Sequence, residues 1–366
     1  MKVFILTQES FPDGMAATHR IRCYARALAG AGVDCEVVRF PASGHGSFKG
    51  VSYVGTGNPS EYLQSNLKKG DVLFFYLGKQ LELTLSLMDL AASRGACSVR
   101  DLCELPYGTG GQSLKTFFLR KRLMFKQFPR LDGIISISES LSSLARRHAS
   151  RSCKHLKVPI MVEPEGFSDA PYEESADPYI FHSGTFLERK DGILGMIEAF
   201  GLEVPSLEHN VRYIMAGDLD ASPQKEDILS LVRKFNLEDR VVFTGPLKDD
   251  EVRRYLMKAS LTILNKHPNT QNLYGFSTKL GEYLAAARPV VITDVGEAMN
   301  WLEDGKTAYV IPHGDTNALA ASIVKAFSDP QTRRTIGLNG RRLAEESFGC
   351  MGWGETLATF MRSLGK

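Results

Sequence analysis

The sequence lacks the features that mark a membrane span, a disulfide framework or a common metal motif. Its apolar runs, such as 72–77, fall far short of the roughly 20 residues that a membrane-spanning helix needs. The six cysteines contain no CxxC pair, so reduced thiols in a cytosolic chain are the simplest interpretation. HExxH and Walker A motifs are also absent, which leaves zinc-protease and P-loop functions without support.

The chain also lacks a large net charge and an export signal. Lysine and arginine number 44 against 42 aspartates and glutamates, so no global basic excess indicates nucleic acid binding. The short apolar stretch 2–7 predicts a strand rather than a signal sequence. What is present, 366 residues of which 43% are hydrophobic and 23% charged, is typical of a globular protein with two domains.

Short runs rich in β-branched residues alternate with longer amphipathic stretches along the chain. This alternation predicts parallel sheets covered by helices on both faces. The rhythm breaks at 158–180, a segment rich in proline and acidic residues that predicts a linker. We therefore predict two doubly wound α/β domains in tandem.

The first expected helix has Ile21, Tyr24 and Leu28 on one face, and glycines follow it as a stop signal. The expected helices of the first domain are 16–30, 80–94, 113–127 and 139–149, and the second domain opens with a helix near 193–200. The expected strands are 2–7, 34–40, 71–77, 96–102 and 132–138 before the linker, and 179–183, 211–216, 240–244, 260–264, 289–293 and 308–311 after it.

The two halves differ in charge. Up to residue 165 the chain has 22 lysines and arginines against 14 acidic residues, whereas the remainder has 22 against 28. Much of the basic excess lies in 112–130, where basic and aromatic residues interleave without one carboxylate. A helix of this composition suits an anionic membrane surface. It also suits a helix that packs its aromatic residues inward and leaves a solvated basic face, so both interpretations stay open.

The segment 274–291 predicts a helix whose first turn faces a ligand. Ser277 or Thr278 can cap this helix, and unpaired N–H groups at its start can bind phosphate in an open α/β sheet. Glu282, beside Lys279 on the polar face, can accept hydrogen bonds from a vicinal diol such as a ribose. A solvated surface carboxylate is the alternative interpretation of Glu282.

Two further turns follow predicted strands. Arg189 and Lys190 come shortly after the strand at 179–183, where adjacent cations can neutralise a departing diphosphate. In the first domain, Gly14 follows the strand at 2–7, and its missing side chain would let backbone approach a phosphate closely. Asp218 and Asp220 form a DxD sequence, but it follows a central strand where a helix should begin, so we expect no metal site.

Together these segments resemble the family 4 glycosyltransferases of the GT-B fold. The resemblance extends over nearly the whole chain and rests on an ordered series of short motifs: Gly184 to Gly192, Ala216-Gly217-Asp218, Arg240 to Gly245, and Thr278 to Val291. It implies two Rossmann-like domains that face each other across a cleft. The expected N-terminal, acceptor-side domain is 1–165 with a helix of about 350–366 that crosses back to it, and the expected nucleotide-sugar-binding domain is 166–349. A simple amphipathic terminal helix would explain the last segment equally well.

The resemblance also implies roles for single residues. Glu282 matches the second glutamate of the family's paired-glutamate motif, which holds the nucleotide ribose, and Lys190 matches its diphosphate-binding lysine. Gly245 and Leu247 fall where the nucleotide base is expected to lie against backbone. The other expected donor-binding positions are Gly14, Gly184, Thr185, Gly217, Tyr274, Gly275, Phe276, Ser277, Thr278 and Lys279.

The chain departs from the family pattern at three places. Tyr274 stands where the first glutamate of the motif would touch the donor sugar, and Thr185 stands where many members have a phosphate-binding arginine. We expect Arg189 to substitute for that arginine. The catalytic histidine often found in the N-terminal domain is missing from the segment around Arg100. The candidates for its role are Asp101, Glu104 and His19.

The resemblance therefore implies transfer of a sugar, with retention of the anomeric configuration, from a UDP- or GDP-linked donor to a hydroxyl group of a glycan or lipid-linked glycan. The implied process is cell-surface polysaccharide synthesis, by a cytoplasmic or peripheral membrane enzyme that needs no cofactor and contacts the inner face of the membrane. Domain closure would exclude water from the reaction. The alternatives are a nucleotide-sugar 2-epimerase of the same architecture and a non-catalytic nucleotide-sugar-binding scaffold, the latter motivated by Tyr274.

Overall fold

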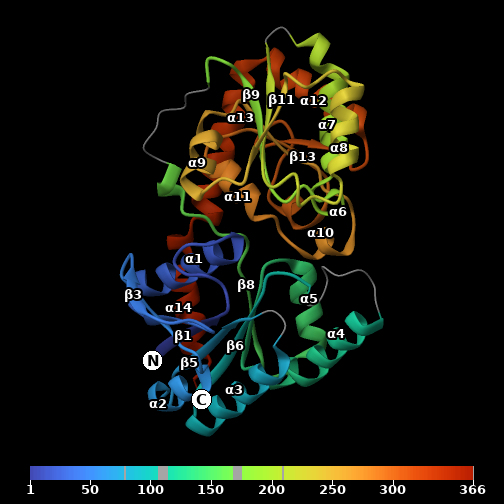
Figure 1. The fold of residues 1–366 in the computed structure, drawn as a ribbon. Coiled ribbons are helices and arrows are strands. Elements are labelled where there is room, and N and C mark those ends of the chain that lie inside the picture. Colours follow the sequence, from blue (N-terminus) through green and yellow to red (C-terminus); the bar gives the residue numbers. More distant parts are fainter. Residues whose placement is uncertain (78–79, 106–113, 168–174, 208–209, 366) are drawn as a thin grey trace. The chain divides into compact units, whose positions relative to one another are not determined.

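A computed structural model describes residues 1–77, 80–105, 114–167, 175–207 and 210–365. The chain divides into two compact units, each an α/β layer structure around its own parallel sheet (Figure 1). Unit 1 consists of residues 1–162, 274–276 and 348–366, and unit 2 of residues 163–273 and 277–347. The tandem α/β prediction is confirmed, although the chain passes between the units more than once.

Unit 1 contains an eight-stranded sheet in the order β3-β4-β2-β1-β5-β6-β7-β8, in which β3 alone runs antiparallel to its neighbour. The strands are β1 (Lys2–Thr7), β2 (Asp34–Arg39), β3 (His45–Phe48), β4 (Val51–Gly55), β5 (Val72–Tyr76), β6 (Cys97–Leu102), β7 (Gly133–Ser136) and β8 (Lys154–Lys157). Three of these, β3, β4 and β8, are missing from the sequence prediction. They lie at or next to the sheet edges and are short and only partly buried, so their hydrophobic pattern is weak.

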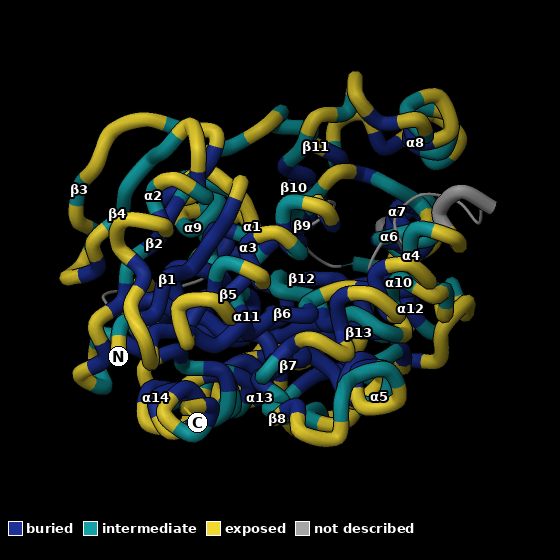
Figure 2. Tube along the Cα trace, turned by 90° about the horizontal axis from the view of Figure 1, so that it is seen from below, coloured by how far each residue is buried: buried dark blue, intermediate teal, exposed yellow. Residues whose placement is uncertain are grey.

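The helices of unit 1 pack on this sheet through apolar faces. They are α1 (Ala16–Gly30), α2 (Pro59–Asn66), α3 (Leu81–Arg94), α4 (Leu114–Lys126), α5 (Glu139–His148) and α14 (Gly354–Ser363). The C-terminal helix α14 returns to this unit, as expected: it contacts α1, and Leu357 and Met361 join the same buried cluster as Val3 and Tyr24. Figure 2 shows the central strands of this sheet as mostly buried.

Unit 2 contains six parallel strands in the order β11-β10-β9-β12-β13-β14. They are β9 (Tyr179–Ser183), β10 (Arg212–Ala216), β11 (Val241–Gly245), β12 (Leu261–Leu264), β13 (Val290–Thr293) and β14 (Tyr309–Ile311). All six match the predicted strands to within a residue or two. The helices are α6 (Glu188–Asp191), α7 (Ile193–Glu203), α8 (Lys225–Lys234), α9 (Asp249–Lys258), α10 (Thr270–Tyr274), α11 (Thr278–Ala285), α12 (Thr316–Ser328) and α13 (Pro330–Leu343).

The predicted linker at 158–180 is only partly a connecting segment. Val158, Ile160 and Val162 are buried in unit 1, and Val162 forms a bridge with Gly349. Residues 164–167 form a short 3-10 turn that belongs to unit 2. The sequence did not predict this packing, because apolar residues at alternate positions over a stretch of only five residues are too few to define a strand.

Candidate functional site

The carboxyl ends of β9 and β12 lie side by side at the point where the strand order of unit 2 reverses. β9 pairs with β10 on one side and with β12 on the other. In doubly wound sheets, ligands bind outside the carboxyl ends of the strands at such a point. The segment after β9 leads through Gly184 to Asp191, and the segment after β12 begins with Asn265 and Lys266. Both segments place charged side chains there.

A buried carboxylate with two lysine partners forms the centre of this region. Asp191 Oδ1 accepts a hydrogen bond from Lys266 Nζ at 2.7 Å, and Oδ2 accepts one from Lys279 Nζ at 2.9 Å. The Asp191 side chain is 1% exposed, whereas that of Lys279 is 16% exposed. Burial opposes ionisation of Asp191, yet the ammonium groups of Lys279 and Lys266 hold its pKa well below the ordinary value. Two cations therefore share one anion.

Lys279 carries the less compensated of the two charges. Burial lowers its pKa to about 8, although the attraction of Asp191 opposes that shift. Lys279 does not share a solvated polar face with Glu282, as the sequence suggested, because its side chain turns inward to Asp191. Glu282 is half-buried on the same helix. An anion that reached Lys279 would supply the missing negative charge.

His182 and Gly184 lie against the same cluster. Burial, reinforced by Lys279, lowers the pKa of His182 to about 3, so its imidazole is neutral at physiological pH. A Cβ atom at Gly184 would lie 2.5 Å from Lys279 Nζ and 3.1 Å from both Asp191 Oδ2 and His182 Nε2. A side chain at position 184 would therefore displace the Lys279 ammonium group from this arrangement.

Arg189 and Lys190 lie on the short helix α6 beside this cluster. Arg189 is exposed and Lys190 is half-buried. The Lys190 carbonyl oxygen accepts a hydrogen bond from Lys266 Nζ at 3.0 Å, which ties α6 to the end of β12. The charge of Lys190 also contributes to the lowered pKa of Lys279. Both cations thus follow the carboxyl end of β9, as the sequence order predicted, and their role stays a prediction.

The helix α11 begins at Thr278 with Ser277 as its N-cap residue, but the Ser277 side chain makes no capping hydrogen bond. Leu280, Tyr283 and Leu284 are buried, which confirms the predicted apolar face. Because the first N–H groups of a helix lack intrahelical partners, the start of α11 offers donors near Lys279.

Glycines follow three adjacent strands of unit 2. Gly184 N donates to Ala216 O at 2.9 Å, and Gly217 N donates to Gly245 O at 3.0 Å. A side chain at Gly217 would collide with the Gly184 carbonyl group, and Gly245 has a φ of 75°. The expected base-binding residue Leu247 is half-buried. Thr185, the replacement for the family's arginine, is exposed.

Asp218 and Asp220, the DxD sequence, have local structural partners. Asp218 Oδ1 accepts a hydrogen bond from Ala221 N at 3.1 Å, and Asp220 pairs with Lys225 at 2.7 Å. Within the described parts of the chain, no group of three or more histidine, cysteine, aspartate or glutamate side chains is arranged to hold a metal ion.

The expected donor-binding residues Tyr274, Gly275 and Phe276 belong to unit 1 rather than unit 2. Ser138 Oγ, at the N-cap of α5, donates a hydrogen bond to the Tyr274 carbonyl oxygen at 2.5 Å. Phe276 is buried and packs edge-to-face on Phe348 with ring centroids 5.8 Å apart. These contacts fix the backbone of the segment to unit 1.

In unit 1, the candidate Asp101 is buried in a closed network. Its carboxylate accepts two hydrogen bonds from Arg20, at 3.1 and 3.2 Å, and one from Tyr24 Oη at 2.6 Å. Arg20 also donates to the carbonyl groups of Val158 and Pro159. The surroundings of Asp101 thus correspond to a structural ion pair and do not support the expected catalytic role.

The remaining unit 1 candidates are more accessible. His19 lies half-buried on the first turns of α1, and Glu104 is exposed after β6. A side chain at Gly14 would meet the Thr18 hydroxyl group, which itself donates to the Ser10 carbonyl oxygen at 2.6 Å. Glycine at position 14 therefore has a local packing reason that is independent of any phosphate.

The sequence interpretation missed two members of the unit 2 cluster, His182 and Lys266, and gave Asp191 no role. A usable signal was present, because charged residues come within a few positions of the ends of the predicted strands at 179–183 and 260–264. Parallel strands bring such residues to one edge of a sheet. The pairing of Asp191 with two lysines depended on side-chain directions that the pattern does not contain.

Residues 177–329, which belong to unit 2 except for 274–276, match the family model described as glycosyl transferases group 1. Among the curated relatives, N-acetyl-alpha-D-glucosaminyl L-malate synthase of Bacillus anthracis is 27% identical over 173 residues, 47% of this chain and 42% of the relative. The capsular polysaccharide biosynthesis glycosyltransferase CapM of Staphylococcus aureus is 28% identical over 43% of this chain and 39% of its own length. The chain thus spans less than half the length of these relatives.

Solved structures match over the whole chain. Anabaena Alr3699/HepE in complex with UDP and glucose superposes with a TM-score of 0.74, 17% identity, and coverage of 99% of this chain and 100% of that protein. A glycosyltransferase from Rickettsia africae also has a TM-score of 0.74, with 13% identity and coverage of 99% and 98%. The two-domain GT-B fold predicted from the sequence is therefore confirmed.

Proposed function

We propose that this chain, whose residues 177–329 match the model of the group 1 glycosyl transferases, moves a sugar from a nucleotide diphosphate sugar to a hydroxyl group of a glycan acceptor. The observation that carries the proposal is the surplus of lysine charge around Asp191 at the strand-order reversal of unit 2. When the bond between the anomeric carbon and the diphosphate breaks, negative charge develops on the leaving group. Cations held in place before the reaction stabilise that charge.

In this proposal, Lys190, Arg189 and Lys279 bind the diphosphate together with N–H groups at the start of α11. Glu282 holds the ribose, and backbone at Gly245 and Leu247 lies against the base. The acceptor oxygen bonds to the anomeric carbon on the face that the leaving group vacates, which retains the configuration, and its proton passes to the diphosphate. A UDP-linked donor is favoured because similar folds have been solved with UDP and UDP-glucose.

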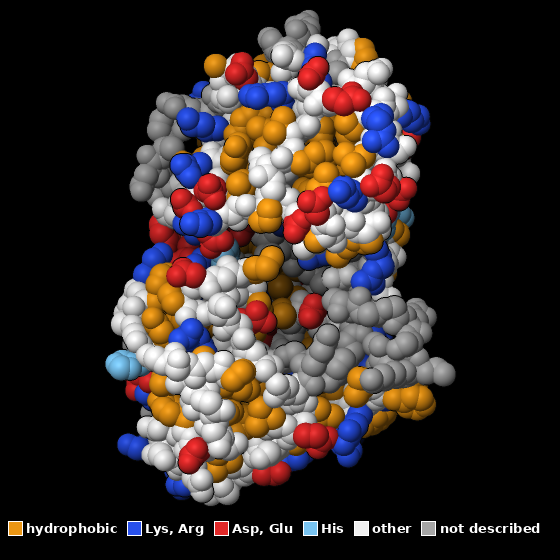
Figure 3. All heavy atoms as spheres, in the orientation of Figure 1, with side chains coloured by type: hydrophobic (Ala, Val, Ile, Leu, Met, Phe, Trp, Pro, Cys, Tyr) orange, Lys and Arg blue, Asp and Glu red, His pale blue; other side chains and the backbone are white. Residues whose placement is uncertain are grey.

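The acceptor in this proposal is a lipid-linked glycan, and the helix α4 would bring unit 1 to an anionic membrane. Phe117, Phe118 and Phe125 are 50%, 65% and 62% exposed, whereas Leu123 and Phe128 of the same segment are buried. Lys121 Nζ lies 5.6 Å from the ring centroids of both Phe117 and Phe125. Figure 3 shows hydrophobic and basic side chains side by side in this region. Exposed aromatic rings beside cations suit the interface of an anionic bilayer.

Among the described residues, no helix is both long and apolar enough to cross a membrane. Vesicle sedimentation would test the surface contact. Replacing Phe117 and Phe118 with serine should reduce binding to vesicles that contain anionic lipid, and raised salt should separately reduce binding of the wild-type protein. Phe235, which is half-buried in unit 2, provides the control substitution. Unchanged binding in the double variant would contradict a membrane role for α4.

Transfer itself is tested with nucleotide sugars. We expect UDP to raise the melting temperature, because a ligand that binds only the folded state stabilises it. We expect Lys190→Ala and Glu282→Ala to remove most transfer while the protein stays folded. Wild-type turnover in both variants would contradict the site. An epimerase would instead produce an isomeric nucleotide sugar without acceptor, and a scaffold would bind the donor without releasing nucleotide.

A further inference from the structure

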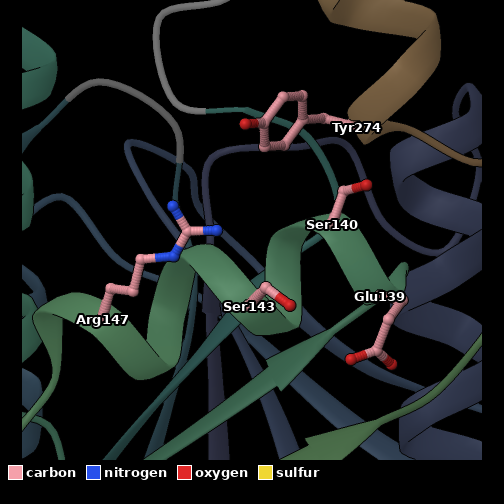
Figure 4. Close-up of a pocket in the computed structure, with 5 residues that line it drawn as sticks. All are labelled: Glu139, Ser140, Ser143, Arg147 and Tyr274. Atoms are coloured by element: carbon pink, nitrogen blue, oxygen red, sulfur yellow. The ribbon is translucent and has the colours of Figure 1, made fainter.

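A pocket of about 260 Å³ lies in unit 1, against one face of α5. Glu139, Ser140, Ser143 and Arg147 of α5 line it together with Tyr274. Figure 4 shows the Tyr274 ring above the helix, with its hydroxyl group on the side of Arg147, whereas the Glu139 carboxylate points away from the ring. The pocket therefore has an aromatic wall on one side and a polar helix face on the other.

The polar groups of this pocket have unused hydrogen-bonding capacity. Within the described residues, the side chains of Ser140, Ser143 and Arg147 make no hydrogen bond or ion pair, and neither does the hydroxyl group of Tyr274. The Tyr274 backbone, by contrast, is fixed by the 2.5 Å hydrogen bond from Ser138 Oγ. The pocket thus combines a fixed backbone with side chains that can serve a ligand.

The charge of the pocket is positive. Glu139 lies 3.7 Å from both Arg146 Nη1 and Lys157 Nζ, so cations outside the pocket lining balance its carboxylate. Arg147 has no such counterpart in the part of the chain that the structure describes. A guanidinium group binds carboxylate and phosphate through two parallel hydrogen bonds, and an unpaired one therefore favours a ligand with an anionic group.

The remaining lining favours a sugar ring as the carrier of that anion. The face of a tyrosine ring offers apolar contact area, and its hydroxyl group adds a hydrogen-bond partner at the edge. Two serine hydroxyl groups one helical turn apart can bind hydroxyl groups of a ring in contact with it. Ligand pockets typically combine an aromatic wall with a few placed polar groups in this way.

We propose that the pocket between α5 and Tyr274 binds a pyranose that carries an anionic group, either a uronate or a sugar phosphate. Arg147 binds the anion, Tyr274 stacks on the ring, and Ser140 and Ser143 bind ring hydroxyl groups. That this sugar is part of the acceptor glycan rests on the proposed function, but its binding does not. Tyr274 occupies the place of the family's first glutamate, so the same substitution that departs from the family supplies the aromatic wall of this pocket.

Calorimetric titration of the full chain with small probes tests the assignment. Methyl glucuronoside and glucose 1-phosphate should each bind at least tenfold more tightly than methyl glucoside, and inorganic phosphate should bind more weakly than either acidic sugar. The relative affinity of the two acidic probes identifies the source of the anion. Equal binding of acidic and neutral sugars, or no binding of any pyranoside, would overturn the proposal.

Substitutions in the pocket test whether the sugar binds there. Arg147→Gln should remove the preference for acidic sugars, and Tyr274→Ala should weaken all pyranosides, whereas the matched control Arg151→Gln, at an exposed arginine outside the lining, should change neither. An unchanged preference in Arg147→Gln would refute the site. UDP binding of the wild-type chain is measured in parallel: a wild type that binds acidic sugars but not UDP would count against the proposed function, and one that binds UDP but no acidic sugar would count against this pocket.

Discussion

Two buried aspartates, one in each unit, show how charge balance separates a structural ion pair from a ligand site. Among the described residues, Asp101 of unit 1 has one cationic partner, and the donors bonded to it lie within a closed network of Arg20 and Tyr24. Asp191 of unit 2 has two cationic partners, one of which remains partly exposed. The first arrangement is neutral and complete, whereas the second carries an excess positive charge that an anionic ligand can neutralise.

The largest expected effect comes from breaking the buried ion pair of Arg20 and Asp101. Arg20→Met should lower the free energy of unfolding by on the order of 3–5 kcal/mol, because it leaves the Asp101 carboxylate buried without a counter-charge. Urea denaturation measures the change. The double variant Arg20→Met/Asp101→Leu should recover part of the loss, since no charge is then stranded. A loss below about 1 kcal/mol would mean that the network is not the source of stability that its geometry indicates.

The second prediction concerns the unit 2 cluster. Lys279→Met should weaken UDP binding at least tenfold, or about 1.4 kcal/mol, with little change in the free energy of unfolding, because Lys266 still pairs with Asp191. Calorimetry and urea denaturation on the same preparation separate the two effects. Lys225→Met, which removes an exposed lysine of the same unit, is the control. A large loss of stability with normal UDP affinity would make this cluster structural as well.

The third prediction uses the lowered pKa of Lys279, which is about 8. As pH rises through this value, Lys279 loses its charge, so UDP affinity should fall severalfold between pH 7 and 9. The neighbours that modulate it are Asp191, Lys266, Lys190 and His182; neutral His182 does not titrate in this range. Lys279→Arg should retain its charge and flatten the profile. An identical profile in Lys279→Arg would assign the decline to another group.

The same shift has a consequence for stability. The ordinary pKa of lysine, 10.5, lies above the folded value, so between these two values the unfolded chain binds more protons than the folded one. The contribution of Lys279 to the free energy of unfolding should therefore rise as pH increases from about 8 to 10.5. The difference between wild type and Lys279→Met in urea denaturation at several pH values isolates this contribution.

The smallest expected effect lies at the surface. Asp220→Asn breaks the 2.7 Å pair with Lys225, both of which are exposed. The free energy of unfolding should change far less than it does in Arg20→Met, because two charges that stay in contact with water gain little from pairing. Urea denaturation in parallel with Arg20→Met provides the measurement. A change as large as that of the buried pair would show that burial is not what distinguishes the two aspartates.

The sequence was sufficient for those elements whose patterns are long or strongly apolar. All six strands of unit 2 and helices such as α1 and α11 were predicted closely, since their apolar residues repeat at the period of one element. The strands β3, β4 and β8 were missed because four or five partly exposed residues do not establish a period. In the candidate site, sequence order located Lys190 and Gly184 at a strand end but gave Asp101 a catalytic role that its buried partners do not support.

The sequence by itself determined the α/β class, the strand sequence of unit 2 and the family resemblance, because each depends on local patterns and on motif order along the chain. Only the tertiary structure decided that Lys266 and Lys279 share Asp191, that Arg20 closes the network of Asp101, and that Tyr274 belongs to unit 1 beside α5. The residues that these contacts join lie 75 to 136 positions apart along the chain. Their charge balance depends on side-chain direction and burial, which a linear pattern does not contain.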